Sequence, residues 1–140
     1  MVVIGDEILS GRTKDKNIGF VAEYLTNLGI DLREVRIVAD EQDQIVDAVN
    51  AVRSRYTYVF TSGGIGPTHD DITANAISAA FGVACTPHPA ALALLESHYA
   101  RSELPFTEAR KRMARTPENA VLIDNPVSKA PGFRIENVHV

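Results

Sequence analysis

Two segments of the chain combine glycines with acidic and hydroxyl side chains in an order that suits the binding of a phosphorylated ligand. The first, residues 5–12, reads Gly-Asp-Glu-Ile-Leu-Ser-Gly-Arg. The second, residues 61–73, reads Thr-Ser-Gly-Gly-Ile-Gly-Pro-Thr-His-Asp-Asp-Ile-Thr. Its closely spaced glycines let backbone N–H groups approach an anion without a Cβ atom in the way. A helix that starts after the loop points the positive end of its dipole toward it, so phosphate or another oxyanion is the predicted ligand.

Two adjacent carboxylates, Asp70 and Asp71, bring negative charge to the same loop. A hard cation such as Mg²⁺ would reconcile them with a phosphate, because it bridges carboxylate and phosphate oxygens. Asp6 or Glu7 from the first segment could complete the oxygen shell of that cation. We therefore predict Mg²⁺ or another divalent cation as a cofactor, held by Asp6, Asp70 and Asp71. Asp70 and Asp71 are also the predicted catalytic residues.

The remaining predicted site residues come from both segments, and they would surround the ligand with backbone N–H groups and short polar side chains. The predicted ligand-binding residues are Gly5, Asp6, Glu7, Ser10, Thr61, Ser62, Gly63, Gly64, Gly66, Pro67, Thr68 and Thr73.

Plainer interpretations of these residues stay open. The glycine-rich segment could be only a tight turn, and Asp71 could simply cap the helix that begins near Thr73. Glu7 could be merely exposed to solvent. The basic side chains between Arg110 and Arg115 could form a solvated helix face or contact a phosphate.

Two common phosphate-binding motifs do not fit the glycine-rich segment. A P-loop requires Lys followed by Ser or Thr after its glycines, whereas Pro67, Thr68 and His69 stand here. A dinucleotide-binding fingerprint follows the first strand and has a third glycine, which this segment lacks.

The hydrophobic periodicity alternates between the strand pattern and the helix pattern, which indicates an α/β fold with a mostly parallel sheet. Gly82 and Thr107 mark a helix end and a helix start, and Asp40 is the predicted cap of another helix. If the strand order begins 2-1-3, both segments follow neighbouring strands and open onto one site. The expected strands lie near residues 1–4, 32–37, 58–60 and 121–123, and a hairpin that turns at Glu136-Asn137 is expected over 133–140. The expected helices lie near 16–28, 41–53, 73–81, 90–100 and 107–115.

Composition excludes several classes of protein. The 140 residues include 14 Lys plus Arg and 18 Asp plus Glu, and the net charge of −4 disfavours a duplex nucleic-acid binder. A single cysteine, Cys85, excludes an internal disulfide and a cysteine-rich zinc site. No apolar run approaches the roughly 20 residues that a membrane span needs, and no basic stretch followed by an apolar one supports an expectation of secretion. We therefore expect a cytoplasmic protein whose partners include neither nucleic acid nor membrane.

Both segments resemble the molybdopterin-binding domains of molybdenum-cofactor biosynthesis. The pattern Gly-Gly-x-Gly-Pro-Thr-x-Asp-Asp-Ile-Thr is most similar to the N-terminal domain of the competence/damage-inducible protein A (CinA) branch and its stand-alone relatives. Asn125-Pro126 and the stretch from Ala130 to Phe133 are similar to that branch as well. The resemblance implies a three-layer α/β/α sandwich with a mostly parallel sheet. It also implies that residues 1–140 form a single domain that lacks its C-terminal end.

The resemblance implies three possible functions. The first is binding of a phosphorylated pterin or nucleotide with divalent-metal-dependent pyrophosphate chemistry, as in hydrolysis of ADP-ribose. The alternatives are an adenylyltransferase of molybdenum-cofactor biosynthesis and a non-catalytic molybdopterin-binding or interaction module. Molybdopterin is then a possible ligand. A homo-oligomer is also expected, because relatives self-associate and the end of the chain, Val138 to Val140, would gain cover.

Overall fold

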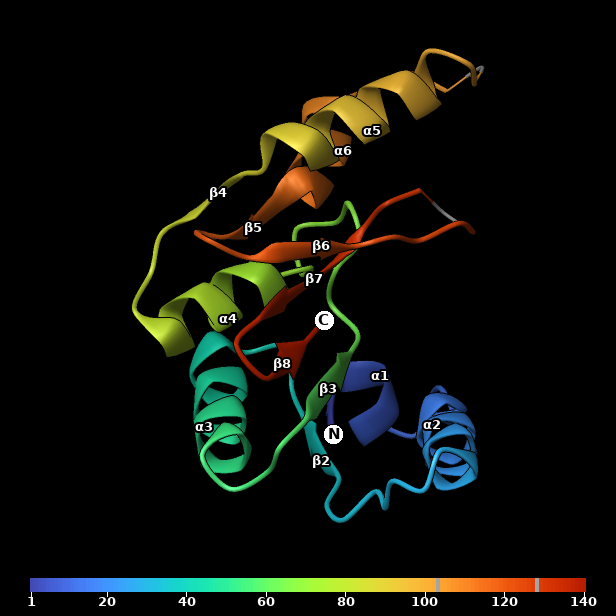
Figure 1. The fold of residues 1–140 in the computed structure, drawn as a ribbon. Coiled ribbons are helices and arrows are strands. Elements are labelled where there is room, and N and C mark those ends of the chain that lie inside the picture. The colour runs from blue at the N-terminus through green and yellow to red at the C-terminus, as the bar shows by residue number, and fades with distance from the viewer. Residues whose placement is uncertain (103, 128) are drawn as a thin grey trace.

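The computed structural model describes residues 1–102, 104–127 and 129–140, which fold around a mostly parallel sheet (Figure 1). Its strands are β1 (Val2–Ile4), β2 (Arg36–Val38), β3 (Val59–Ser62), β6 (Val121–Ile123), β7 (Gly132–Ile135) and β8 (Val138–His139). They lie in the order β2-β1-β3-β8-β7-β6. Strands β2, β1, β3 and β8 run parallel, whereas β7 is antiparallel to both of its neighbours.

Helices cover both faces of this sheet and complete a three-layer arrangement. Helices α3 (Gln42–Arg53) and α4 (Thr73–Phe81) lie on one face, and α1 (Asp6–Leu9) and α2 (Asn17–Asn27) lie on the other (Figure 1). The main core lies between the sheet and the α3–α4 layer, because α3 turns one apolar stripe inward. Its fully buried side chains include Val2, Ile4, Ile45, Val49, Val52, Val59, Ile77 and Val138.

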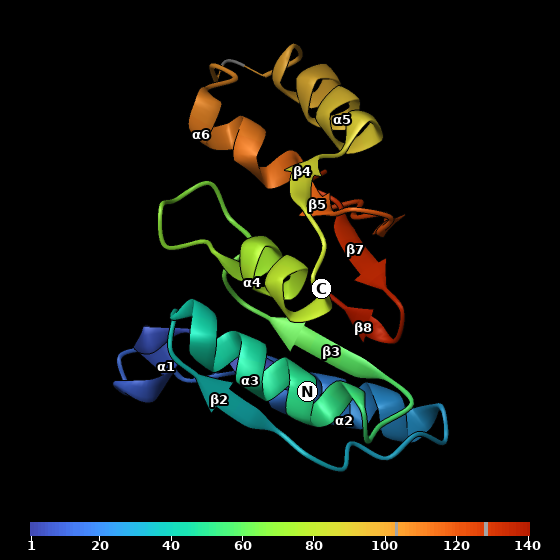
Figure 2. The same ribbon diagram turned by 90° about the vertical axis from the view of Figure 1, so that its left-hand side faces the viewer.

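A smaller lobe follows α4 and lies at one end of the molecule (Figure 2). It consists of the antiparallel pair β4 (Cys85–Pro87) and β5 (Arg115–Pro117), helices α5 (Pro89–Tyr99) and α6 (Glu108–Lys111), and the 3₁₀ turn η1 (Arg112–Ala114). A second apolar cluster holds this lobe together around Ala91, Leu95 and Ala114. In the described part of the chain, no helix is both long and apolar enough to cross a membrane.

The α/β fold is confirmed, and the sheet has the 2-1-3 order on which a shared site depends. Strand β1 pairs in parallel with both β2 and β3, so the two candidate segments follow neighbouring strands. Helix α4 has the predicted bounds and ends at Gly82, whose φ of +66° is the left-handed conformation expected of a C-cap. The Thr107 side chain accepts a hydrogen bond of 3.3 Å from the Arg110 N–H, as predicted for a cap.

Three details of the sequence-based prediction are wrong. Asp40 does not cap α3, because that helix begins after Glu41. The Asp40 carboxylate instead accepts a hydrogen bond from the Asp6 N–H at 2.9 Å. Arg115 does not extend the basic helix but begins β5. The end of the chain is not uncovered either, because β8 lies inside the sheet between β3 and β7, with Val138 buried. The need to cover an exposed end is therefore no reason to expect self-association.

Candidate ligand-binding site

The loop after β3 begins with a turn that only glycine can form. Gly63 has a φ of +104°, and a Cβ atom there would overlap the carbonyl oxygen of Ile4 on the neighbouring strand β1. Gly64 has a φ of +64°, and a Cβ atom there would overlap the Thr73 hydroxyl. Both positions therefore combine a left-handed backbone with close packing. We call residues Gly63 to Gly66 the glycine turn.

Thr73, the first residue of α4, fixes this turn. Its N–H donates to the Gly64 carbonyl at 3.0 Å, and its hydroxyl donates to the Gly63 carbonyl at 2.9 Å. The sequence analysis predicts Thr73 as a ligand-binding residue. Its side chain is fully buried, however, so its hydroxyl supports the turn and is not offered to a ligand. The carbonyls of Gly63 and Gly64 are thus occupied, while the N–H groups of Gly64, Ile65 and Gly66 have no acceptor among the described residues.

Asp71 holds the remainder of the loop closed. Its carboxylate accepts hydrogen bonds from the Thr68 N–H, at 2.7 Å, and from the Thr68 hydroxyl. The interpretation of Asp71 as a helix cap is wrong, because Ile72 is the N-cap of α4 and no described side chain caps that helix. Asp71 also packs against Gly66, where a Cβ atom would approach its carboxylate to 2.7 Å.

Asp70 and His69 lie at the outer end of the same loop. The Asp70 side chain is 64% exposed and the His69 side chain 94% exposed, with 3.9 Å between Nδ1 and Oδ1. The Thr68 hydroxyl, the Asp70 backbone and His69 favour the charged form of Asp70 and lower its pKa. The Thr68 hydroxyl donates to Asp71 and also lies close enough to Asp70 to lower the pKa of that carboxyl. Asp70 is ionised and open to solvent.

The first segment does not bring its acidic side chains to Asp70 and Asp71. Residues Asp6–Leu9 form α1, in which the Asp6 carboxylate accepts from the Asp40 N–H at 3.4 Å. Among the residues that the structure describes, no three His, Cys, Asp or Glu side chains are grouped to hold a metal ion. A resident cation shared by Asp6, Asp70 and Asp71 therefore does not fit this arrangement.

A groove of about 380 Å³ lies between the two segments and is large enough for a small ligand. Glu7, Ser62 and Gly63 line it, as predicted. The sequence analysis missed its other wall, which comprises Thr13, Lys14, Asp15, Lys16 and Asn17 at the start of α2. The two lysines were a signal for anion binding, but nothing in the sequence placed them opposite the glycine turn.

Hydrogen bonds fix both walls of this groove. Asn17 Nδ2 donates to Ser62 Oγ at 2.6 Å and joins α2 to the end of β3. The Asp15 carboxylate accepts a hydrogen bond from the Ile18 N–H at 2.7 Å, so it is directed toward the start of α2. Ser10 Oγ accepts from Arg12 Nε at 3.0 Å and donates to the Glu7 carbonyl at 3.3 Å, so it supports α1. Thr61 Oγ1 is buried and has no partner among the described residues.

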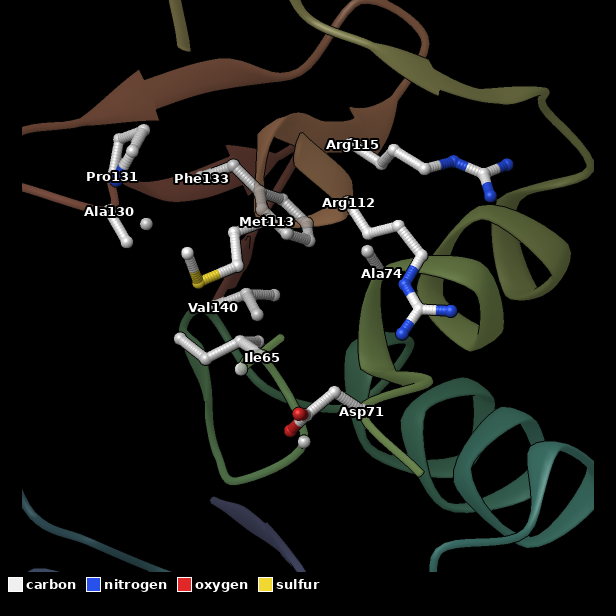
Figure 3. A pocket seen from close by; sticks show the side chains of 13 residues that line it. Ile65, Asp71, Ala74, Arg112, Met113, Arg115, Ala130, Pro131, Phe133 and Val140 are labelled. Carbon is white, nitrogen blue, oxygen red and sulfur yellow. The ribbon is translucent and has the colours of Figure 1, made fainter. Parts of the chain in front are cut away.

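A second, smaller hollow lies on the other side of the glycine turn (Figure 3). Its volume is about 40 Å³, and Figure 3 shows Ile65, Met113 and Phe133 gathered on its apolar side. Arg112 Nη2 donates to the Pro67 carbonyl at 3.0 Å, which ties the smaller lobe to the loop. This contact joins residues that are 45 positions apart, and the sequence analysis did not place Arg112 at the site.

Comparison with known sequences places the whole chain in a single family profile. Residues 1–140 match a family described as "Probable molybdopterin binding domain". A protein of Aeropyrum pernix is 36% identical over 136 residues, which cover 97% of this chain and 51% of that protein. A protein of Pyrobaculum arsenaticum is 38% identical over 133 residues, which cover 95% of this chain and 50% of that protein. The chain therefore spans about half the length of the curated relatives it matches.

Solved structures extend the likeness to the fold. The CinA protein of Thermoplasma acidophilum, described as of unknown function, has a TM-score of 0.88 at 33% identity; the match covers 99% of this chain and 83% of that protein. The molybdopterin biosynthesis enzyme MoaB of Thermus thermophilus has a TM-score of 0.53 at 19% identity, over 86% of this chain and 70% of that protein. At that identity, the second likeness shows a shared fold alone.

Proposed function

Because this chain belongs to the family of probable molybdopterin-binding domains, with the CinA protein among its relatives, we propose that it binds a phosphorylated pterin or nucleotide. The observation that carries this proposal is the set of donors in the glycine turn. The N–H groups of Gly64, Ile65 and Gly66 lack acceptors in the described part of the chain, and they precede the nine-residue helix α4. The turn lies beside the start of α4, where the Thr73 N–H bonds the Gly64 carbonyl, and the positive end of the helix dipole favours an anion there.

The ligand takes its place partly on this turn and partly in the groove beside it. The phosphate accepts hydrogen bonds from the turn, and the remainder of the molecule lies in the groove between α1 and the start of α2. Lys14 and Lys16 supply positive charge there beside the carboxylates of Glu7 and Asp15, the second of which is directed to the Ile18 N–H. A groove of about 380 Å³ lies near the lower end of the usual range for small-molecule sites.

A divalent cation enters this site with the phosphate and not as a resident ion. Mg²⁺ is commonly held by one or two carboxylates together with the phosphates of the substrate. Asp70 on the loop and Glu7 in the groove wall are the carboxylates available for this purpose, since Asp71 is engaged by Thr68 and Asp6 lies against Asp40. When bound, the cation would neutralise phosphate charge and polarise the phosphoryl oxygen.

The decisive experiment is a calorimetric titration of the protein with molybdopterin and with ADP-ribose, each with and without Mg²⁺. We expect saturable binding of at least one ligand. A double Lys14→Gln, Lys16→Gln variant should bind it about tenfold more weakly, equivalent to ~1.4 kcal/mol. The single Arg33→Gln variant is a control, because Arg33 is an exposed cation outside the groove. No binding of any phosphorylated ligand would contradict the proposal.

Product analysis separates the catalytic alternatives. A metal-dependent pyrophosphatase, which the Gly-Pro-Thr-x-Asp-Asp pattern favours, should release AMP from ADP-ribose only when a divalent cation is present. An adenylyltransferase should consume ATP when molybdopterin is supplied. A non-catalytic binding module should do neither while still binding its ligand.

Self-association is a further expectation, and α2 offers a surface for it. Phe20, Tyr24 and Leu28 recur at helical spacing and are 69%, 58% and 60% exposed, with Phe20 and Tyr24 stacked. Antiparallel pairing of two copies of α2 would bring Phe20 against Leu28 of the partner subunit. In sedimentation equilibrium we expect the mass to rise with concentration, and Tyr24→Gln to weaken this more than Leu94→Gln on α5 does. A monomer mass at every concentration would contradict the expectation.

A further inference from the structure

We propose that the side chains around η1 form a second phosphate site in a hollow between β5 and α6, although its Arg112 and Arg115 also line the smaller hollow beside the glycine turn. The hollow has a volume of about 280 Å³ and is lined by Pro87, Glu108, Lys111, Arg112 and Arg115. Three cations thus face one carboxylate, in a chain whose net charge is −4. Such a local excess of positive charge is suited to an anion with more than one negative charge.

The two guanidinium groups have donors to spare. Arg112 and Arg115 make no ion pair within the described residues. Each gives one hydrogen bond to a backbone carbonyl, Arg112 to Pro67 at 3.0 Å and Arg115 to Cys85 at 2.8 Å. A guanidinium carries five N–H donors in a planar fork that matches phosphate oxygens. Most of these donors are therefore free for a ligand.

The same two hydrogen bonds hold the guanidinium groups in place before any ligand binds. Figure 3 shows the Arg112 and Arg115 side chains extending to the same side of η1, while Met113 and Phe133 lie on the other side with the apolar lining. The bond to Cys85 anchors Arg115 to β4, and the bond to Pro67 anchors Arg112 to the loop after β3. Donors that are already held in place lose little conformational entropy on binding, so they bind an anion more tightly than mobile surface cations do.

The neighbouring charged residues make sharp comparisons possible. Lys111 is paired with Glu108 at 2.6 Å, so part of its charge is already neutralised. Arg110 lies on the same helix but does not line the hollow; its guanidinium donates to the Pro105 carbonyl and stacks 4.9 Å from the Tyr99 ring centroid. Arg110 is therefore a control for Arg115, since it carries the same charge five positions earlier, on α6 and not on β5, and does not line the hollow.

The first test is a calorimetric titration of the protein with inorganic phosphate at low ionic strength. We expect Arg115→Gln to weaken phosphate binding about tenfold and Arg110→Gln to change it by less than about twofold. Glu108→Gln should strengthen binding severalfold, because it releases Lys111 from its ion pair; this variant changes a side chain that is 88% exposed, so the fold is preserved. The proposal would be overturned if Arg115→Gln and Arg110→Gln lost phosphate affinity equally. It would also be overturned if neither Arg115→Gln nor Glu108→Gln changed that affinity.

A competition experiment identifies the source of the phosphate. If saturating inorganic phosphate weakens ADP-ribose binding in the unmodified protein but not in Arg115→Gln, the hollow holds a phosphate of the nucleotide. If ADP-ribose binding is unaffected while phosphate binding still depends on Arg115, the hollow holds a separate anion. Both results support the site. Phosphate binding that depends on Arg115 in a protein that binds neither molybdopterin nor ADP-ribose would refute the proposed function and leave this site standing.

Discussion

The Gly63→Ala variant should unfold at a markedly lower urea concentration than the Gly82→Ala variant. Both residues have a positive φ, +104° at Gly63 and +66° at Gly82, so alanine is strained at either position. Placing a non-glycine residue in the left-handed region costs roughly 1–2 kcal/mol of folding free energy. At Gly82 nothing lies within 4 Å of the added Cβ atom, so backbone strain is the whole expected cost.

Gly63 adds a steric cost, because its Cβ atom would overlap the Ile4 carbonyl oxygen, a backbone atom of a central strand. Overpacking of this kind costs about 1–3 kcal/mol in addition. Urea denaturation gives the free energy of unfolding of each variant. The midpoint should shift further for Gly63→Ala, while the slope of the free energy against urea concentration stays unchanged. Equal losses in the two variants would mean that the turn can move away from β1, and the tight positioning of the donors in the glycine turn would then be wrong.

The positions of most strands in the main sheet and of the glycine turn could be predicted because they depend on local signals. Apolar runs identify the strands, and Gly82 and Thr107 end or begin helices through their own backbone geometry or side chain. The carboxyl ends of neighbouring parallel strands meet at one edge of a sheet, so the order 2-1-3 was sufficient to bring both segments together.

The features that could not be predicted depend on contacts between distant residues. Asp71 and Asp40 both have the chemistry of helix caps, and each bonds a loop or neighbouring segment instead. The choice between these partners is decided by the path of the backbone, which residue type alone does not determine. The bond from Arg112 to Pro67 and the placement of Lys14 and Lys16 beside Ser62 likewise result from packing across the sheet.

The smaller lobe illustrates the same limit in secondary structure. Strands β4 and β5 are three residues long each, carry prolines and have no apolar alternation, so their sequence does not predict strands. They pair because α5 and η1 pack around Leu95 and Ala114, which brings Cys85 opposite Pro117. Since Arg115 belongs to this pair and not to the basic helix, its guanidinium reaches the hollow beside α6.

The two carboxylates of the loop should respond differently to mutation, although they are adjacent in sequence. Asp71→Ala removes the acceptor of the Thr68 N–H and hydroxyl, so the loop should open and ligand binding should weaken both with and without Mg²⁺. The lost hydrogen bonds are worth roughly 1–2 kcal/mol, or about tenfold in affinity. Asp71→Asn keeps one carbonyl acceptor and should lose less.

Asp70→Asn should instead reduce only the increase in affinity, or in turnover, that Mg²⁺ produces. The Asp70 carboxylate is exposed, and because its pKa is lowered from a value that already lies far below 7, it is charged at neutral pH. Asp6→Asn should leave the Mg²⁺ response unchanged, because that carboxylate lies against Asp40. Titrations of all four variants with ADP-ribose and molybdopterin, with and without Mg²⁺, together with melting temperatures, separate these effects. If Asp70→Asn and Asp71→Asn both keep the full Mg²⁺ response, the carboxylates are structural and the cation prediction fails.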